Sequence, residues 1–147
     1  MSYTVDIMSA PLPRSYDEAF ALRDQRIEER DARIGSNTGS PFEEPSGEMR
    51  ELHRRLTARF PCICDDPDGP WSDGPLINNF GQRAATLGIS FSGVAEALPF
   101  LIATALEMGF WVLDGQDDVV HLPGGTVLRS HAAEPDEPAR PWWRFWR

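Results

Sequence analysis

The stretch ATLGISFSGVAEALPFLIATALEMGFWVLDGQDDVVHL, residues 85–122, decides the fold class. It opens with apolar side chains at every second position over residues 85–91, which is the period of a half-buried β-strand. Residues 93–108 then carry apolar side chains at helical spacing, and we expect this helix to be the most buried of the chain. Two short apolar runs, 110–113 and 119–122, flank a polar turn and predict a β-hairpin. Strands grouped in hairpins favour an antiparallel sheet with helices packed on one face.

The sequence upstream supplies another strand, two helices and one further short strand. Alternating apolar residues predict a half-buried strand at the start of the chain: Tyr3, Val5 and Ile7. Residues 15–18, SYDE, form a capping box that begins a long, well solvated helix, which Gly35 ends. A second helix is expected over residues 47–60, and a strand over residues 76–80. The predicted fold is therefore α+β with a mainly antiparallel sheet, in the order β-α-α-β-β-α-β-β.

The domain organisation follows from length and from the composition of the C-terminal part. At 147 residues the chain has the length of one domain that needs no disulfide or metal to fold. We expect that single domain over residues 1–123. Residues 124–139 are rich in Pro, Glu, Ala and Asp, without a periodic apolar face, and predict a flexible linker. Residues 140–147 form a terminal tail rich in Trp and Arg.

The charge and the cysteine content narrow the classes of partner and compartment. The formal net charge is −9, and all 14 basic residues are arginine. Such a surface repels phosphate, so we expect no nucleic-acid partner and favour a basic protein partner. Two cysteines one residue apart are unlike a secreted disulfide framework, and the N-terminus has no signal-peptide pattern. No apolar run approaches the length of a membrane span, so the expected location is the cytoplasm.

Two short motifs superficially resemble metal sites, and neither meets the requirements. Cys62 and Cys64 are separated by one residue, whereas paired zinc ligands are usually two to four residues apart and need two further ligands. In DPDG, residues 66–69, a calcium loop would place Cys64 and Pro75 at its first and twelfth ligand positions, where carboxylates are required. We therefore expect no metal site, with the cysteines acting as small packing residues.

The sequence contains no motif of nucleophilic catalysis and no phosphate-binding loop. Asp114 and His121 could meet across the last hairpin, close enough to share a proton, although structural pairing is the commoner meaning of such a contact. We expect a protein that is not an enzyme and that needs no cofactor.

An acidic loop is the candidate surface for a protein partner. Four aspartates surround Trp71, and two more lie on a separate turn: Asp65, Asp66, Asp68 and Asp73, then Asp117 and Asp118. An aromatic anchor ringed by carboxylates suits the capture of a basic partner, because the ring supplies contact area and the charges speed the encounter. The alternative is a solvated turn in which Trp71 folds back into the core.

The tail PWWRFWR, residues 141–147, is the least ordinary segment. Its aromatic residues predict a contact, because large exposed apolar groups usually mark one: Trp142, Trp143, Phe145 and Trp146. We expect them to dock on their own domain or on a second copy, which would make a homo-oligomer. A groove on another protein and a membrane interface are the alternatives, and the acidic domain disfavours the membrane.

Three segments together resemble a loose group of small, uncharacterised bacterial α+β proteins: SYTVD (2–6), WSDGPL (71–76) and LDGQDDVVHLP (113–123). The resemblance implies that Gly74 and Pro75 turn the chain into the next strand, and that Gln116 bonds backbone groups across the final turn. The group is similar in size, acidity and architecture to immunity proteins that neutralise bacterial toxins.

These observations lead to one functional hypothesis with two alternatives. The first is a non-catalytic interaction protein, an immunity protein that occludes the active site of a toxin with its acidic surface. The second is a small enzyme or ligand-binding module whose site is assembled from dispersed residues. The third is a membrane-peripheral adaptor that uses the tail.

Overall fold

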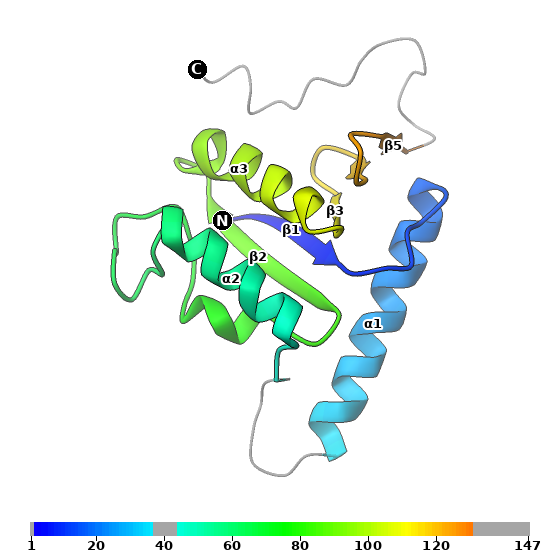
Figure 1. The fold of residues 1–147 in the computed structure, drawn as a ribbon, viewed down its shortest axis with the longest axis horizontal. Helices are drawn as coiled ribbons and strands as arrows, with labels where there is room; N and C mark the ends of the chain where they lie inside the picture. The colour runs from blue at the N-terminus through cyan, green and yellow to red at the C-terminus, as the bar shows by residue number, and fades with distance from the viewer. Residues whose placement is uncertain (1, 37–43, 131–147) are drawn as a thin grey trace.

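A computed structural model describes residues 2–36 and 44–130 of the chain. Their elements follow one another as in Figure 1: β1 (Ser2–Met8), α1 (Tyr16–Ser36), α2 (Gly47–Arg59), the 3-10 helix η1 (Leu76–Asn79), β2 (Ala84–Ser90), α3 (Val94–Glu107), β3 (Trp111–Asp114), β4 (Val119–His121) and β5 (Val127–Arg129). The α+β class, the antiparallel sheet and the order of the main elements are confirmed.

The strands form one antiparallel sheet in the order β2-β1-β3-β4-β5. β1 pairs along its whole length with β2, from Ser2 opposite Ser90 to Met8 opposite Ala84. Its other edge pairs with β3, where Asp6 lies opposite Leu113. The strand at the start of the chain therefore lies inside the sheet and joins β2 to the β3–β4 hairpin.

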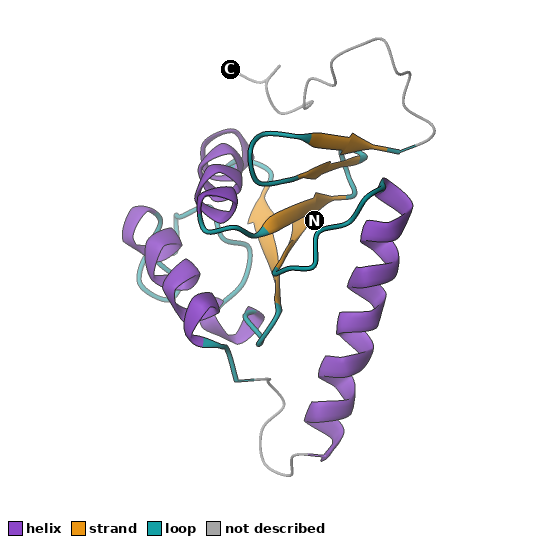
Figure 2. Cartoon of the chain, turned by 45° about the vertical axis from the view of Figure 1, so that its right-hand side comes forward, coloured by secondary structure: helices purple, strands orange, loops and turns teal. Residues whose placement is uncertain are grey.

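The helices cover both faces of the sheet, which differs from the single covered face that we expected. Figure 2 shows α1 on one side of the strands and α2 with α3 on the other. The larger core joins Tyr3, Val5 and Ile7 of β1 to α2 and α3. A smaller core on the α1 side contains Met8 and Ala19 together with Trp111, Leu113 and Val120. Both faces can be covered because β3 is apolar at successive positions, not only at alternate ones.

Two predictions about short strands are corrected by the structure. The segment expected to be a strand over residues 76–80 folds instead as η1, and only Phe80 makes an isolated bridge, to Ala85. β5 was not predicted. It pairs with β4 after a turn in which Gly124 and Gly125 adopt φ of 88° and 89°, a region that favours glycine.

β5 moves the domain boundary, because the sheet continues past residue 123. The predicted flexible linker therefore begins too early, and residues 124–130 belong to the domain. Residues 131–147, and with them the predicted docking of the tail, lie outside the described residues.

Candidate functional site: an arginine-lined groove

A groove runs between α1 and the part of the sheet formed by β1 and β2. Its floor is polar because β1 alternates, so that Ser2, Thr4 and Asp6 face away from the larger core. Thr86 and Gly88 of β2 lie opposite Asp6 and Thr4 and continue the same floor. These floor residues offer no apolar side chain against which α1 could pack closely, so the space between α1 and the two strands stays open.

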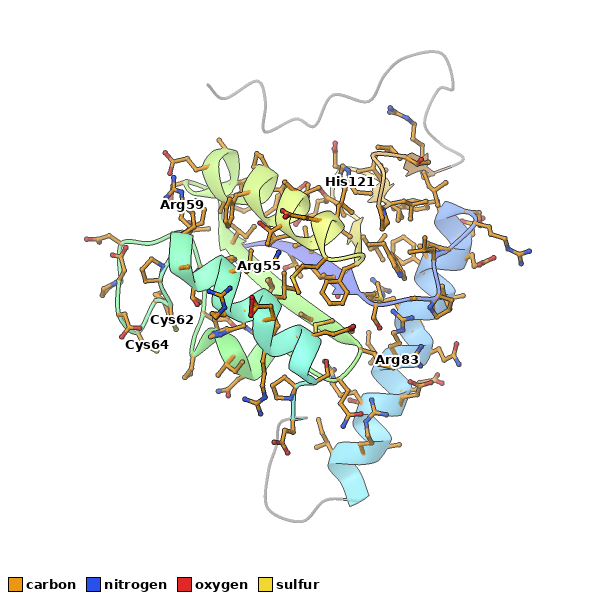
Figure 3. All side chains as sticks on the ribbon, viewed as in Figure 1. Arg55, Arg59, Cys62, Cys64, Arg83 and His121 are labelled. Atoms are coloured by element: carbon orange, nitrogen blue, oxygen red, sulfur yellow. The ribbon has the colours of Figure 1, made fainter. Side chains whose placement is uncertain are left out.

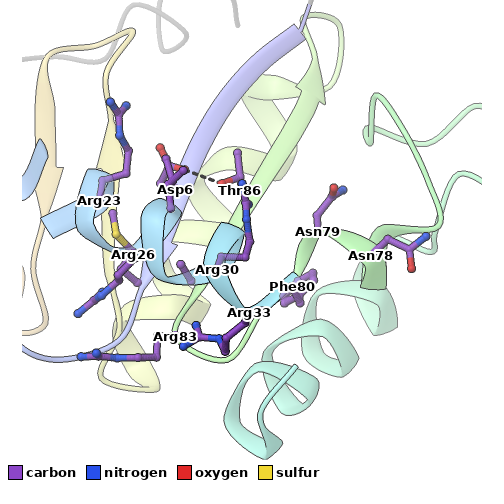
Figure 4. A pocket seen from close by; sticks show the side chains of 14 residues that line it. Asp6, Arg23, Arg26, Arg30, Arg33, Asn78, Asn79, Phe80, Arg83 and Thr86 are labelled. Atoms are coloured by element: carbon purple, nitrogen blue, oxygen red, sulfur yellow. Dashed lines mark hydrogen bonds between the residues drawn. The ribbon is translucent and has the colours of Figure 1, made fainter. Parts of the chain in front are cut away.

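The wall of the groove is a row of arginines on α1. Arg23, Arg26, Arg30 and Arg33 follow at intervals of three and four residues, which places them on one face of the helix. Figure 4 shows these side chains between the helix and the strands, with Arg83 entering from the turn before β2. Five guanidinium groups therefore line one cavity of a chain whose net charge is −9.

Arg26 and Arg83 converge on a single carbonyl group. Both donate through Nη2 to the carbonyl oxygen of Ala10, at 3.1 and 3.2 Å. Trp111 holds that segment in place, since its Nε1 donates to the carbonyl oxygens of Ser9 and Pro11, at 3.1 Å each. Two guanidinium groups are thus fixed side by side on one neutral acceptor.

The charge of Arg26 is poorly compensated. The residue is only 5% exposed, and within the described part of the chain its Nη1 atom is buried without a hydrogen-bond partner. Desolvation, and then the neighbouring Arg83, lower the pKa of Arg26 to about 10. Glu29 offsets this in part, and it also pairs with Arg83 at 3.7 Å. An unpaired buried charge is costly, and an anion placed here would relieve that cost.

Two other arginines of the wall, Arg23 and Arg30, have acidic partners on their own helix. Arg23 pairs with Asp24 at 3.0 Å and Arg30 with Asp31 at 3.6 Å, and both aspartates are largely exposed. Such surface pairs contribute little and exchange readily with other anions. Asp6 on the floor accepts from Thr86 Oγ1 at 2.7 Å, and burial raises its pKa.

The groove has room for a ligand. Its inner part, beside Met8 and Arg26, has a volume of about 40 Å³, which suits a few waters or a small anion. The adjoining open part, above Thr4 and Gly88, measures about 520 Å³. That volume is in the range of about 300–1,000 Å³ found for small-molecule pockets.

The acidic residues predicted to bind a partner do not form one surface. Asp65, Asp68 and Asp73 are exposed on the loop that follows α2, whereas Asp66 is half-buried, and its carboxylate accepts from the amide of Asp68 at 3.3 Å. In Figure 1 this loop and the β3–β4 turn, which carries Asp117 and Asp118, lie on different sides of the domain. Asp118 stands beside α1, where it accepts from the Tyr16 hydroxyl at 3.3 Å.

Trp71 is not the exposed anchor that we expected. It is 1% exposed, and its Nε1 donates to the carbonyl oxygen of Phe60 at 2.7 Å. A bridge to Ile89 fixes it further against the edge of β2. The alternative interpretation, a tryptophan that folds back into the core, is confirmed, and the acidic loop has no aromatic anchor at this position.

Asp114 accepts hydrogen bonds from β1 and from the final turn. Its Oδ2 accepts from the Tyr3 hydroxyl at 2.5 Å, and its Oδ1 accepts from the amide of Asp117 at 3.2 Å. Gln116 was expected to bond backbone groups across the final turn, but its Oε1 accepts instead from the amide of Thr4 on β1, at 2.7 Å. These contacts tie the final turn to β1 and indicate a structural role.

The groove was missed at the level of sequence, although one signal was present. The arginines of α1 were assigned to a solvated charged face, because aspartates and glutamates alternate with them along the same helix. Their spacing of three and four residues could have shown that they share one face. That this face opposes a polar strip of sheet depends on tertiary structure.

Metal centres and membrane spans have no candidate in the described ranges, 2–36 and 44–130. They contain no group of three or more His, Cys, Asp or Glu residues placed to hold a metal ion. No helix there has the length and apolar character needed to cross a membrane. Comparison with models of protein families, with curated proteins and with solved structures finds no significant match to this chain.

Proposed function

We propose that the chain is a non-catalytic binding module, and that its arginine-lined groove holds an anionic group of the ligand. The observation that carries the proposal is Arg26, a buried guanidinium with an unpartnered Nη1 atom beside the like charge of Arg83. Glu29 compensates this pair only in part, so the fold gains little stability from keeping the two charges together. Arrangements that cost stability are typical of binding sites, where the ligand supplies the missing contacts.

Guanidinium groups indicate the chemistry of the ligand. Arginine presents a planar set of donors that matches carboxylate, sulfate and phosphate oxygens. The chain as a whole has a net charge of −9, so the groove gathers basic side chains on a protein that is acidic on average, and the steering of an anionic group toward it depends on these arginines. The open part above β1 and β2 leaves space for the rest of a larger ligand or for a segment of a partner protein.

Titration with inorganic phosphate or sulfate tests this site directly. We expect a saturable rise in the melting temperature of the full chain, compared with chloride at equal ionic strength, because a ligand bound only to the folded state stabilises it. R26Q and R83Q should each weaken the apparent affinity about tenfold or more, since a charged hydrogen bond contributes about 1.5–3 kcal/mol.

R14Q is the matched control for this titration, because Arg14 is 90% exposed and does not line the groove. It should respond to the anions as the native protein does. If the anions raise the melting temperatures of the native chain, R26Q and R83Q equally, the proposed groove site is contradicted, because the stabilisation would then not depend on these arginines.

A second candidate function is the capture of a basic protein partner, as in an immunity protein that covers the active site of a toxin. It is favoured by the exposure of Asp65, Asp68 and Asp73 on one loop, which leaves these carboxylates available to an incoming surface. Inhibition would work by occlusion, and the long-range attraction would mainly raise the association rate. Both candidates are binding functions, and we place the protein in the cytoplasm, where free cysteines are expected.

The acidic loop is tested by removing the charges of Asp65 and Asp68 while keeping Asp66, whose carboxylate accepts a hydrogen bond within the turn. D65N/D68N should slow association with a basic partner isolated from the source cells several-fold and flatten its dependence on salt, because exposed charges steer the encounter. E96Q/E107Q removes the same net charge from exposed positions of α3 and serves as the control. If the two double variants associate at the same rate at every salt concentration, the loop is not the contact surface.

A further inference from the structure

Cys62 and Cys64 lie together on a tight turn directly after α2. The turn is closed by two backbone hydrogen bonds to the carbonyl oxygen of Cys62, from Asp65 at 2.8 Å and from Asp66 at 2.9 Å. Cys62 is half-buried and Cys64 is exposed. Figure 3 places the pair in the loop beyond α2, away from Arg83 and the groove.

The two sulfur atoms face the same small space. The Cys62 Sγ accepts a hydrogen bond from the amide of Leu76 at 3.3 Å. Gly74 lies against both side chains, since a Cβ atom at this position would be 3.2 Å from one sulfur and 3.4 Å from the other. The missing side chain of Gly74 therefore leaves room for the thiols to stay adjacent.

The environment makes the two thiols unequal. Desolvation alone would raise the pKa of Cys62, but hydrogen bonds from the amides of Cys64 and Leu76 outweigh it and lower the pKa below the ordinary thiol value. The pKa of Cys64 is raised, first by its hydrogen bond to Cys62 and then by desolvation. Cys62 is thus suited to be the attacking thiolate, and Cys64 to be the second thiol that completes the exchange.

We propose that Cys62 and Cys64 form a thiol–disulfide exchange site that takes up small disulfides and closes to an intramolecular disulfide. The proposal does not depend on the groove. The ligand class follows from access, because the attacking Cys62 is only half-buried beside the exposed Cys64, so that a small reagent is favoured over a bulky one.

The exchange takes place in two balanced steps. The Cys62 thiolate attacks one sulfur of the small disulfide, so that a mixed disulfide forms and one thiolate leaves. Cys64 then gives its proton to solvent and attacks the Cys62 sulfur, which releases the second thiolate. The cysteine pair is oxidised by two electrons, and one small disulfide is reduced to two thiols, which take up the released protons.

The closed form should be easily reduced again. Two residues span at most about 7 Å between Cα atoms when extended, and less in a turn, which is compatible with the separation of about 4.4–6.8 Å that disulfides require. A ring closed through one intervening residue is short, and strained or exposed disulfides are the labile ones. The site is therefore expected to cycle and not to act as a permanent staple.

Reaction of the folded full chain with glutathione disulfide tests the proposal. We expect the native protein to lose two hydrogen atoms by intact mass and both thiols by titration, and to recover them with excess reduced glutathione. C64S should stop at one glutathione adduct on Cys62, while C62S should react several-fold more slowly. A native protein that ends with an adduct on each cysteine, or C62S and C64S reacting at equal rates, would overturn the assignment.

G74A tests the geometry without removing a sulfur atom. Its new methyl group would lie 2.5 Å from Ile63 Cγ2 and press on both thiols, so ring closure should slow and the mixed disulfide should accumulate. G47A is the control, because a Cβ atom there meets nothing within 4 Å. Melting curves confirm that each variant is folded. Closure in folded G74A at the native rate would show that the shared space is not what pairs the thiols.

Discussion

W71A is expected to lower the free energy of unfolding by about 3–5 kcal/mol, the usual cost of truncating a buried large aromatic side chain. Trp71 is 1% exposed and belongs to the larger core, together with Leu76 and Ile89. The truncation also leaves the carbonyl oxygen of Phe60 without the donor that it now has at 2.7 Å. Urea denaturation followed by circular dichroism measures the loss, and 3 kcal/mol is a large fraction of the stability of a domain.

Two further variants separate packing from bonding. W71F keeps most of the ring volume and removes only the indole donor, so a smaller loss of about 1–3 kcal/mol is expected. L12A removes an apolar side chain that is 43% exposed and should stay within about 0.5 kcal/mol of the native protein. If W71A is as stable as L12A, Trp71 does not contribute to the core, and the interpretation of Trp71 as an exposed anchor would be favoured again.

The fold was predictable where one periodicity dominated a segment. The alternation of Tyr3, Val5 and Ile7 identified β1, and its partner face is indeed the larger core. The apolar spacing in α3 identified the most apolar helix, which begins at Val94 and contains Pro99 within it. These elements carry enough apolar side chains on one side for local sequence to agree with the tertiary contacts.

Short and half-polar segments were harder to predict. Residues 76–80 have the apolar content of a strand, but the amides of Asn78 and Phe80 bond back to Pro75 and Ile77 and form a 3-10 turn. β5 has only three residues, too few to show the alternation that marks a strand. It forms because β4 offers a free edge after a glycine turn, a circumstance that local sequence does not show.

The arginine-lined groove could not be predicted from the sequence for a different reason. Charged residues of both signs alternate along α1, and composition cannot distinguish a solvated face from the wall of a groove. Arg26 becomes unusual only because Trp111, 85 residues later, and the turn at Arg83 enclose it. The prediction for the acidic loop was wrong in the opposite direction. Trp71 stands in a polar sequence that is typical of an exposed loop, yet its side chain is buried in the core.

D114N is expected to stabilise the domain at neutral and higher pH. Asp114 is fully buried, and this burial raises its pKa to about 6, although hydrogen bonds from Tyr3 and the Asp117 amide act in the other direction. Because an unfolded Asp titrates near 3.8, the folded state binds more protons between about pH 4 and pH 6. The contribution of this group to stability is therefore complete below pH 4 and is lost as the pH rises through 6.

The size of that loss follows from the shift in pKa. Two units correspond to roughly 3 kcal/mol between acidic and neutral pH. Asparagine has the same shape and no charge, and its amide can replace the carboxylate beside Tyr3 while its oxygen keeps the Asp117 amide. Equilibrium denaturation of D114N between pH 4 and pH 8 should then show a flatter profile and a gain of roughly 1–3 kcal/mol at pH 8.

D118N is the matched control, because Asp118 lies on the same turn but is exposed. Its φ of 56° is one that asparagine tolerates as well as aspartate does, so the turn should survive the change. The native pH profile should persist in D118N and disappear only in D114N. A D114N variant that is less stable at every pH, with the native slope retained, would mean that the buried carboxylate is fully compensated by its hydrogen bonds. Asp114 would then be a net stabilising contact between β1 and the final turn, and its burial would carry no cost that a neutral side chain could recover.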